Sequence, residues 1–527
     1  MNRKEFLQYS AAGVIIPNLL NGFGVNATAS SPWLRLLSDT TVETDHVLVL
    51  IRLDGGNDGL NTVIPLDQYD TLALVRPQVL LPENQILGLD GTDTVGFHPS
   101  LSGMRDLYNE GKLKVIQSVG YPNQDYSHFR STDIWMTGAN TTEVFSSGWM
   151  GRYLNYEYPN YPNGFPNEVM PDPLSIEIGA SLSLALQGPS FAMGLSVADP
   201  SQFYQLVNGV PSTAPATPAG ELLTYVRTVK QQSNAYGQVI VDAFENSNNL
   251  AAYPEENVLA EQLKIVARLI AGGLKTRVYL VSISGFDTHD AQVMPEDKTT
   301  GEHADLLGVL SGAITAFVRD LEMQGLSDRV TGMTFSEFGR RIISNLSNGT
   351  DHGAAAPMFV FGSQVAGGIL GDNPFIPPGA DAIDNLPMQY DFRSVYTTML
   401  KDWFCIPEAD LGGILLHDFQ SLPIFNSPDC MPVSTREENQ HAGSKLLELW
   451  PNPFTESLSI RFSSSGGRTL IQVFNGAGQL VATPANRDFP AGEQRLDWES
   501  GELPTGHYYV RIQQGAFQQV KVAAKAK

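Results

Sequence analysis

Apolar residues in this chain gather in short runs that stop at clusters of polar or glycine residues. The first run is Val47–Leu53, seven residues rich in Val, Leu and Ile. A run that is apolar at successive positions is typical of a strand buried on both faces, as in parallel sheets covered by helices. The run ends at Asp54, Gly55 and Gly56. The pattern therefore predicts a buried strand with polar groups at its carboxyl end.

The same alternation of strand and helix patterns continues for more than 300 residues. Apolar strand-like runs recur at 113–119, 174–178, 276–284, 330–335 and 357–361. Helical spacing occupies 97–111, 221–246, 255–272 and 303–324. Strands that alternate with helices favour an α/β fold with a mostly parallel sheet covered by helices. We place this domain at residues 45–425.

The pattern changes after this domain. Residues 426–446 are polar and contain Pro, Ser, Asn and Glu, which predicts a linker. Short alternating segments separated by turn residues follow, at 457–462, 470–474, 493–498 and 507–512. They predict a small all-β sandwich over residues 447–527. No histidines or acids cluster there, so we assign this sandwich no chemistry.

The first 29 residues have the order of an export signal. Arg3 and Lys4 precede the largely apolar segment 6–25, and Ala27-Thr28-Ala29 has the small-x-small pattern of a cleavage site. Residues 2–7 resemble a twin-arginine signal with Lys4 in place of the second arginine, and a Sec signal is the alternative. We therefore expect an exported protein.

The net charge and the number of cysteines argue against some classes of partner and of binding site. The chain has 33 basic and 56 acidic residues, a formal net charge of −23, which argues against nucleic acid as a partner. Its two cysteines, Cys405 and Cys430, could pair in an oxidising compartment. Two thiols exclude a disulfide scaffold and argue against a cysteine zinc site.

Polar clusters follow several predicted strands of the α/β domain. Because the carboxyl ends of parallel strands meet at one sheet edge, we expect these side chains to converge there. Carboxylates and imidazoles together suit zinc, with calcium, magnesium or manganese as alternatives. The predicted ligands of this divalent ion are Asp54, Asp287, His289, Glu337, Asp351 and His352.

Simpler interpretations exist for each of these residues. An aspartate can orient a histidine within a polar loop, and Glu337 can pair with Arg340 or Arg341. Asp54, Asn57 and Asp58 could instead hold a structural calcium ion.

Ser127 is the candidate nucleophile, because it stands at a predicted helix N-terminus where backbone N–H groups favour a developing alkoxide. Its alternative role is helix capping. His128 is assigned a catalytic role beside it. The candidate substrate-binding residues are Asn57, Asp58, Arg130 and Arg152.

Six motifs in order resemble the DUF1501 family over residues 45–425. They are Leu53-Asp-Gly-Gly-Asn-Asp-Gly-Leu-Asn61, Ser127-His-Phe-Arg-Ser131, Gly148-Trp-Met-Gly-Arg152, Gly285-Phe-Asp-Thr-His289, Ser336-Glu-Phe-Gly-Arg340 and Asp351-His352. The resemblance implies a fold like that of alkaline phosphatases and sulfatases. It would match Asp54 to a metal-binding acid and Ser127 to the nucleophile. Asp287, His289, Asp351 and His352 would match two acid–histidine metal pairs, although Glu337 stands where those enzymes place Asp-His.

The C-terminal segment is similar to the type IX secretion sorting domain of Bacteroidetes. The matching residues are Trp450-Pro-Asn-Pro-Phe454, Val473-Phe-Asn-Gly-Ala-Gly478, Gly506-His-Tyr-Tyr-Val-Arg-Ile512 and a basic end at Lys521, Lys525 and Lys527. This resemblance implies the type IX secretion machinery as a partner. It implies a secreted or outer-membrane surface location.

Together these patterns predict an exported, metal-dependent hydrolase-like protein that acts on phosphate or sulfate esters of small molecules or glycans. The alternative is a non-catalytic surface module that is stabilised by a metal and binds glycans or proteins.

Overall fold

A computed structural model describes residues 44–200, 236–426, 430, 445–475, 480–501, 503–514 and 517–526. The predicted export signal, most of the predicted linker and most of the predicted helix 221–246 lie outside these ranges. The chain divides into two compact units, one from residue 43 to Cys430 and another that contains residues 431–527. Each unit is described by itself.

The larger unit is built on a nine-stranded sheet with the order β11-β5-β10-β9-β1-β8-β6-β7, in which β12 also pairs with β5. The strands are β1 (Val47–Asp54), β5 (Leu113–Gly120), β6 (Ser175–Ile178), β7 (Leu195–Val197), β8 (Val278–Ser284), β9 (Val330–Phe335), β10 (Ala356–Phe361), β11 (Gly368–Leu370) and β12 (Tyr390–Asp391). The first predicted strand, β1, lies near the middle of the sheet, where it pairs in parallel with both β8 and β9.

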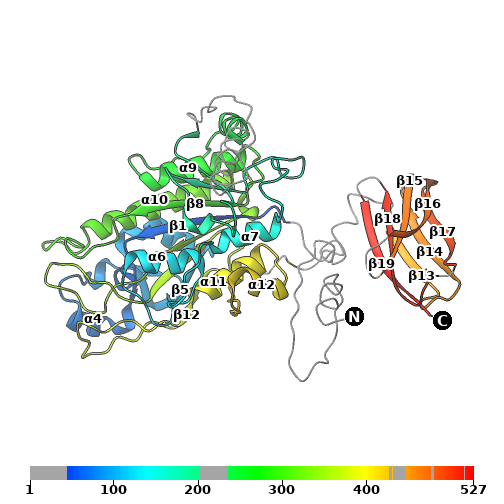
Figure 1. The fold of residues 1–527 in the computed structure, drawn as a ribbon. Helices are drawn as coiled ribbons and strands as arrows, with labels where there is room; N and C mark the ends of the chain where they lie inside the picture. Colours follow the sequence, from blue (N-terminus) through cyan, green and yellow to red (C-terminus); the bar gives the residue numbers. More distant parts are fainter. Residues whose placement is uncertain are drawn as a thin grey trace, which may run out of the picture. The chain divides into compact units, whose positions relative to one another are not determined.

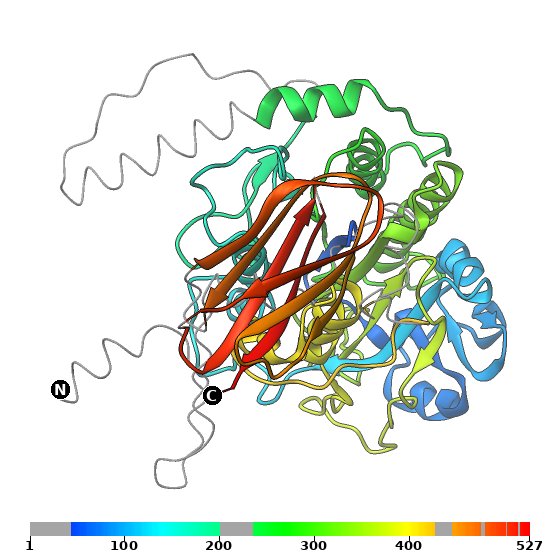
Figure 2. The ribbon, with the colours of Figure 1, turned by 90° about the vertical axis from the view of Figure 1, so that its right-hand side faces the viewer.

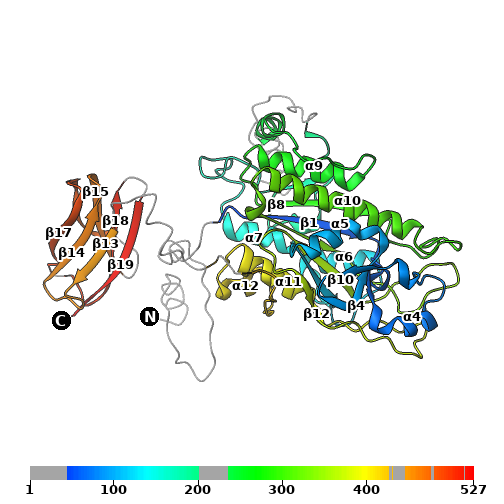
Figure 3. The ribbon, with the colours of Figure 1, turned by 180° about the vertical axis from the view of Figure 1, so that it is seen from behind.

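Helices cover both faces of this sheet (Figures 1 and 3). One layer contains α5 (Ser102–Asn109), α9 (Val258–Ala271) and α10 (Glu302–Met323). The other contains α6 (His128–Thr137), α7 (Trp149–Glu157), α11 (Phe392–Thr398), which continues into a π-helical turn at Met399–Trp403, and α12 (Glu408–Leu415). Alternate residues of β1 enter different cores: Val49 and Ile51 pack in the first layer's core, Leu48 and Leu50 in the second. The period of two along a strand explains this division.

A smaller sheet contributes residues such as Val63 and Phe97 to the core of the first layer. Strands β2 (Val63–Pro65), β4 (Thr92–Phe97) and β3 (Leu87–Leu89) form it. The short helix α3 (Gly59–Thr62) precedes β2, and α4 (Tyr69–Val75) lies between β2 and β3 in sequence. The predicted helix 97–111 is shorter in the structure, since its first residues belong to β4 and to a 3₁₀ turn at Pro99–Leu101.

The prediction of a mostly parallel sheet covered by helices is confirmed. Its exception is β10, which is antiparallel to both of its neighbours, β5 and β9. Residues 336–355, between β9 and β10, contain no helix. A parallel return needs a crossover, usually helical, so this segment brings the chain back in the opposite direction. It also carries Glu337, Asp351 and His352 to the carboxyl ends of β1 and β8.

Cys405 and Cys430 form a disulfide in the larger unit. The sequence left this pairing open. Disulfides persist in oxidising compartments, so the bond agrees with export. None of the helices in the described ranges is long and apolar enough to span a membrane.

The C-terminal unit is an all-β structure, coloured orange to red in Figure 2. One sheet has the order β13-β14-β17 and the other β16-β15-β18-β19, with antiparallel pairings throughout. The strands are β13 (Lys445–Trp450), β14 (Ser457–Ser464), β15 (Gly467–Asn475), β16 (Leu480–Phe489), β17 (Gly492–Glu499), β18 (Gly506–Gln514) and β19 (Phe517–Lys525). The four predicted segments correspond to β14, β15, β17 and β18. Inward residues such as Ile460, Val473 and Val510 form its core.

Candidate metal centre

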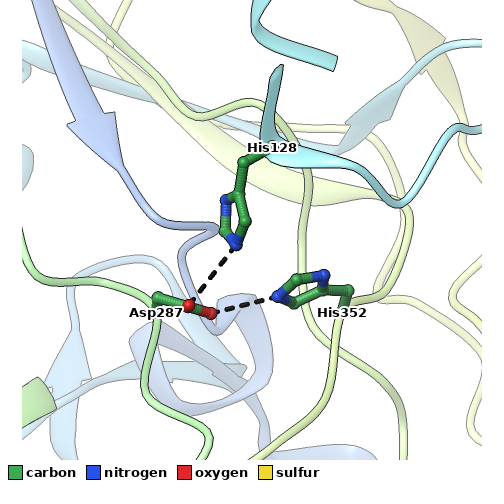
Figure 4. Close-up of side chains that lie close together, drawn as sticks. All are labelled: His128, Asp287 and His352. Atoms are coloured by element: carbon green, nitrogen blue, oxygen red, sulfur yellow. Dashed lines mark hydrogen bonds and ion pairs between the residues drawn. The ribbon is translucent and has the colours of Figure 1, made fainter. Parts of the chain in front are cut away.

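Three side chains from distant parts of the chain meet at the carboxyl edge of the sheet (Figure 4). His128 is the first residue of α6, Asp287 lies in the loop after β8, and His352 lies shortly before β10. Their nearest ligand atoms all lie within 4.8 Å of one another. Asp287 contacts both histidines: its Oδ2 lies 3.4 Å from His128 Nε2, and its Oδ1 lies 3.0 Å from His352 Nε2.

His289 extends this group from the same loop as Asp287. Its Nε2 lies 2.8 Å from His352 Nε2 and 3.2 Å from Asp287 Oδ1. Three imidazole Nε2 atoms thus face one carboxylate. We refer to His128, Asp287, His289 and His352 as the candidate metal centre.

The second ring nitrogen of each histidine has an acceptor. Nδ1 lies 2.8 Å from Glu337 Oε1 in His128, 2.9 Å from Asp351 Oδ1 in His289 and 2.9 Å from the carbonyl oxygen of Tyr126 in His352. Carbonyl and carboxylate oxygens only accept, so each Nδ1 can donate to its partner while Nε2 is left to bind a cation. Such outer contacts fix the tautomer and orientation of metal-ligating histidines.

In that arrangement each Nε2 would offer a lone pair to the cation. The Nε2 atoms of His289 and His352 lie 2.8 Å apart, and both face Asp287 Oδ1. Burial lowers the pKa of His352 below its ordinary value, which favours the neutral ring that a cation needs. A cation bound among these atoms would be coordinated by the imidazole nitrogens and the carboxylate.

Both aspartates of the site are ionised at neutral pH. Burial raises the pKa of Asp287, but hydrogen bonds from Arg340 and His352 lower it more, and its pKa falls to about 2. The pKa of Asp351 is also lowered, because hydrogen bonds from His289 and Asn345 outweigh burial. Glu337 is buried and accepts from the backbone N–H of Gly55 at 2.9 Å in addition to His128. It pairs with neither Arg340 nor Arg341, the partners considered from sequence.

The turn after β1 packs closely against the backbone of the loop that contains Asp287. Gly55 has φ +125°, and a Cβ there would lie 2.3 Å from the backbone nitrogen of Asp287. Only glycine permits both this conformation and this approach.

Ser127 is the N-cap residue of α6 and is exposed. Its side chain makes no capping hydrogen bond, and its hydroxyl has no hydrogen-bond partner in the part of the chain that the structure describes. Its backbone N–H donates to Asp125 at 2.8 Å. The hydroxyl is therefore available next to His128, and the alternative role as a capping side chain has no contact to support it.

Asp54 is not part of the close group. Its carboxylate pairs with Arg52 at 2.5 Å and accepts from the hydroxyl of Ser284 at 3.3 Å. Its side chain keeps an exposed fraction of 35%. Its role as a metal ligand stays a prediction.

Asn57 and Asp58 lie inside the protein and not on an open surface. Asp58 pairs with the buried guanidinium of Arg76 and accepts from Gln292 at 2.6 Å. Asn57 Oδ1 accepts from Thr62 at 3.0 Å and from His303 Nε2 at 3.1 Å. This network supports the turn after β1, and a direct contact of Asn57 or Asp58 with substrate stays a prediction.

Burial of His303 in this network predicts acid sensitivity. Burial lowers the pKa of His303 from 6.5 to about 4, with Asp58, Arg76, Arg340 and His98 around it. The unfolded chain gains the proton first as pH falls, so stability present above pH 6.5 is lost toward pH 4. We expect His303 to account for about 2 kcal/mol of stability lost between pH 7 and pH 5. Urea unfolding at both pH values should show a smaller loss in His303→Gln but the full loss in the exposed control His507→Gln.

Arg130 and Arg152, predicted to bind an anionic substrate, are both bonded to backbone carbonyls. Arg130 donates to the carbonyls of Asn140, Thr141 and Glu143. Arg152 is buried and donates to the carbonyls of Thr137, Ser147 and Ile414. The contacts of Arg130 tie α6 to the loop that follows it, and those of Arg152 tie α7 to α6 and α12. Substrate binding by either residue stays a prediction.

Two contributors to the site were missed from sequence, the carbonyl oxygen of Tyr126 and the guanidinium of Arg340. A backbone oxygen carries no sequence signal. Arg340 ends the Ser336-Glu-Phe-Gly-Arg340 motif, which was the available signal, and it donates to Asp287 at 2.8 Å.

The fold and the site thus define an α/β protein with three histidines and a carboxylate gathered at the carboxyl edge of its sheet. Residues 45–400 match the family described as "Protein of unknown function (DUF1501)", and the chain belongs to this family. Residues 448–524 match the "Secretion system C-terminal sorting domain". No curated protein matches the chain.

Several solved structures show a distant likeness. A protein in the alkaline phosphatase superfamily from Vibrio parahaemolyticus is 8% identical, with a TM-score of 0.33 and coverage of 92% of this chain and 83% of that chain. A sulfatase from Pseudoalteromonas sp. is 12% identical, with a TM-score of 0.31 and coverage of 88% and 85%. A phosphonate monoester hydrolase from Silicibacter pomeroyi is 11% identical, with a TM-score of 0.27 and coverage of 91% and 87%. The fold of the larger unit is assigned from its own sheet topology and not from these low TM-scores.

Proposed function

We propose that this protein is an exported, metal-dependent hydrolase of phosphate or sulfate esters. The observation that carries the proposal is the convergence of three imidazole Nε2 atoms on the carboxylate of Asp287. The ester class follows from the resemblance of the sequence motifs to the DUF1501 family, which implies a fold like that of alkaline phosphatases and sulfatases.

The ligand set in this proposal is His128, Asp287, His289 and His352. Three nitrogens and one carboxylate favour zinc, since calcium and magnesium prefer oxygen ligands. Glu337 and Asp351, predicted as ligands, serve here as acceptors that orient His128 and His289. His128 therefore holds the ion and is not itself the general base.

Ser127 is the nucleophile in this proposal. A bound divalent cation would polarise the ester oxygens and favour the deprotonated hydroxyl. Helix α6 begins directly after Ser127, so its N-terminal backbone N–H groups favour an anionic ester beside the hydroxyl.

The Ser127→Ala variant tests this role. We expect its turnover of an aryl phosphate or aryl sulfate to fall by roughly 1,000-fold or more, while its zinc content stays that of the wild type. Steady-state kinetics with metal analysis measures both. The exposed control Ser347→Ala should keep full turnover. Unchanged turnover in Ser127→Ala would exclude the serine as nucleophile.

The alternative, a non-catalytic binding module, has one specific observation in its favour. Phe129, next to His128 in sequence, has an exposed fraction of 88%, and Tyr126 has one of 39%. Exposed aromatic side chains beside a site favour contact with a ligand ring or a protein surface. Wild-type protein that binds zinc and shows no turnover of any ester tested would support this alternative.

We also propose that the protein is exported. The secretion sorting domain and the disulfide between Cys405 and Cys430 support passage through an oxidising compartment. We propose the type IX secretion machinery as the partner of the sorting domain, with secretion or attachment to the outer-membrane surface as the result.

A further inference from the structure

Arg340 is a buried arginine whose nitrogens are all engaged. Its side chain has an exposed fraction of 0%. Nε donates to the carbonyl of Gly56 at 2.8 Å, and Nη1 donates to the carbonyl of Thr350 at 2.9 Å. Nη2 donates to the carbonyls of Gly55 at 2.5 Å and Phe286 at 2.8 Å, and to Asp287 Oδ1 at 2.8 Å.

These acceptors belong to segments that build the candidate metal centre. Phe286 and Asp287 belong to the loop that carries Asp287 and His289, and Thr350 stands two residues before His352. Gly55 donates its backbone N–H to Glu337, the acceptor of His128. Arg340 therefore bonds to the segments that carry His289 and His352. It also bonds to Gly55, whose backbone N–H holds Glu337, the acceptor of His128.

We infer that Arg340 is a positioning residue that fixes Asp287 and the segments of His289 and His352 for a divalent cation. This inference rests on the proposed metal centre and adds the residue that assembles it. The guanidinium has a planar array of five N–H groups, which can serve several acceptors at once. Lysine has the same charge but cannot reproduce this geometry.

Charge and geometry predict opposite effects on metal affinity. A positive charge beside Asp287 repels a dication, so loss of that charge alone would tighten zinc binding. Loss of orientation weakens binding instead, and outer contacts of metal ligands are typically worth about 10-fold to 100-fold in affinity. The variants Arg340→Lys, which keeps the charge, and Arg340→Gln, which removes it, separate the two.

The experiment measures zinc affinity of the full chain by competition with a chelator, together with the visible absorption of the cobalt-substituted protein. We expect both Arg340 variants to bind zinc about 10-fold to 100-fold more weakly, with altered cobalt bands. The matched control is Arg393→Lys. Arg393 is also buried and bonded to a carboxylate, Asp391, and to the carbonyl of Ala139, and it bonds to none of the four residues of the candidate metal centre. Circular dichroism of the metal-free variants monitors folding.

The possible results test the metal centre and the positioning role of Arg340 separately. A wild type that binds no zinc would overturn the proposed metal centre itself. Wild-type affinity in both Arg340 variants, or tighter binding in Arg340→Gln, would overturn only the positioning role. Unfolding of both Arg340 variants while Arg393→Lys folds would also overturn it, in favour of a purely structural role.

Discussion

Replacing Asp287 with asparagine should lower the affinity for zinc on the order of 100-fold or more, since even contacts behind a metal ligand are worth 10-fold to 100-fold. Asp287 supplies the negative charge of the candidate metal centre and faces all three histidines. The amide would leave neutral imidazoles and the positive charge of Arg340 beside the cation. Metal analysis after dialysis against a graded series of chelator concentrations measures the loss. Turnover, if present in the wild type, should fall with it.

The matched control is Asp54→Asn, which removes the same charge at the end of β1. Asp54 bonds to Arg52 and Ser284 and to none of the four proposed ligands. We expect its zinc affinity to stay within about threefold of the wild type. An equal loss in both variants would instead place Asp54 among the ligands, as the sequence predicted.

The second large effect concerns stability and not metal binding. Arg76→Met should lower the free energy of unfolding by about 3–5 kcal/mol, because it leaves Asp58 buried and without its cationic partner. Both side chains have exposed fractions of 1% or less, so water cannot replace the lost contact. Urea unfolding of the full chain, followed by tryptophan fluorescence and compared with the wild type, measures this loss.

An exposed ion pair provides the comparison. Lys401 and Glu408 pair at 2.9 Å with exposed fractions of 35% and 80%. Lys401→Met should change the free energy of unfolding by less than about 1 kcal/mol. A loss of similar size in the two variants would show that burial of the Arg76–Asp58 pair does not control its contribution.

Much of the fold could be predicted because strand and helix periodicities are local. The runs at 47–53, 113–119, 276–284 and 330–335 became β1, β5, β8 and β9. The reversed direction of β10 was not predicted, since an apolar run contains no information about its partner strand. In the C-terminal unit β13, β16 and β19 were missed. Strand β16 alternates weakly and is mostly exposed or half-buried, so its sequence lacks a clear apolar face.

The residues of the candidate site were found from sequence more reliably than their roles. His128, Asp287, His289 and His352 were all named, because each stands beside a predicted strand or helix end. The division between proposed ligands and orienting acceptors could not be derived. It depends on which ring nitrogen faces which oxygen, and those oxygens belong to Glu337, Asp351 and the backbone of Tyr126.

The sequence by itself determined the layered α/β domain, the separate β domain and the chemical types of side chain gathered at one sheet edge. These follow from periodicity and composition, which act over a few residues. Tertiary structure alone decided that His128 and His352, more than 200 positions apart, point their Nε2 atoms at one carboxylate. It also buried Asn57 and Asp58 and placed Arg340 behind Asp287. Such geometry depends on contacts between distant segments, whose distances and angles are set only when the sheet and its loops pack together.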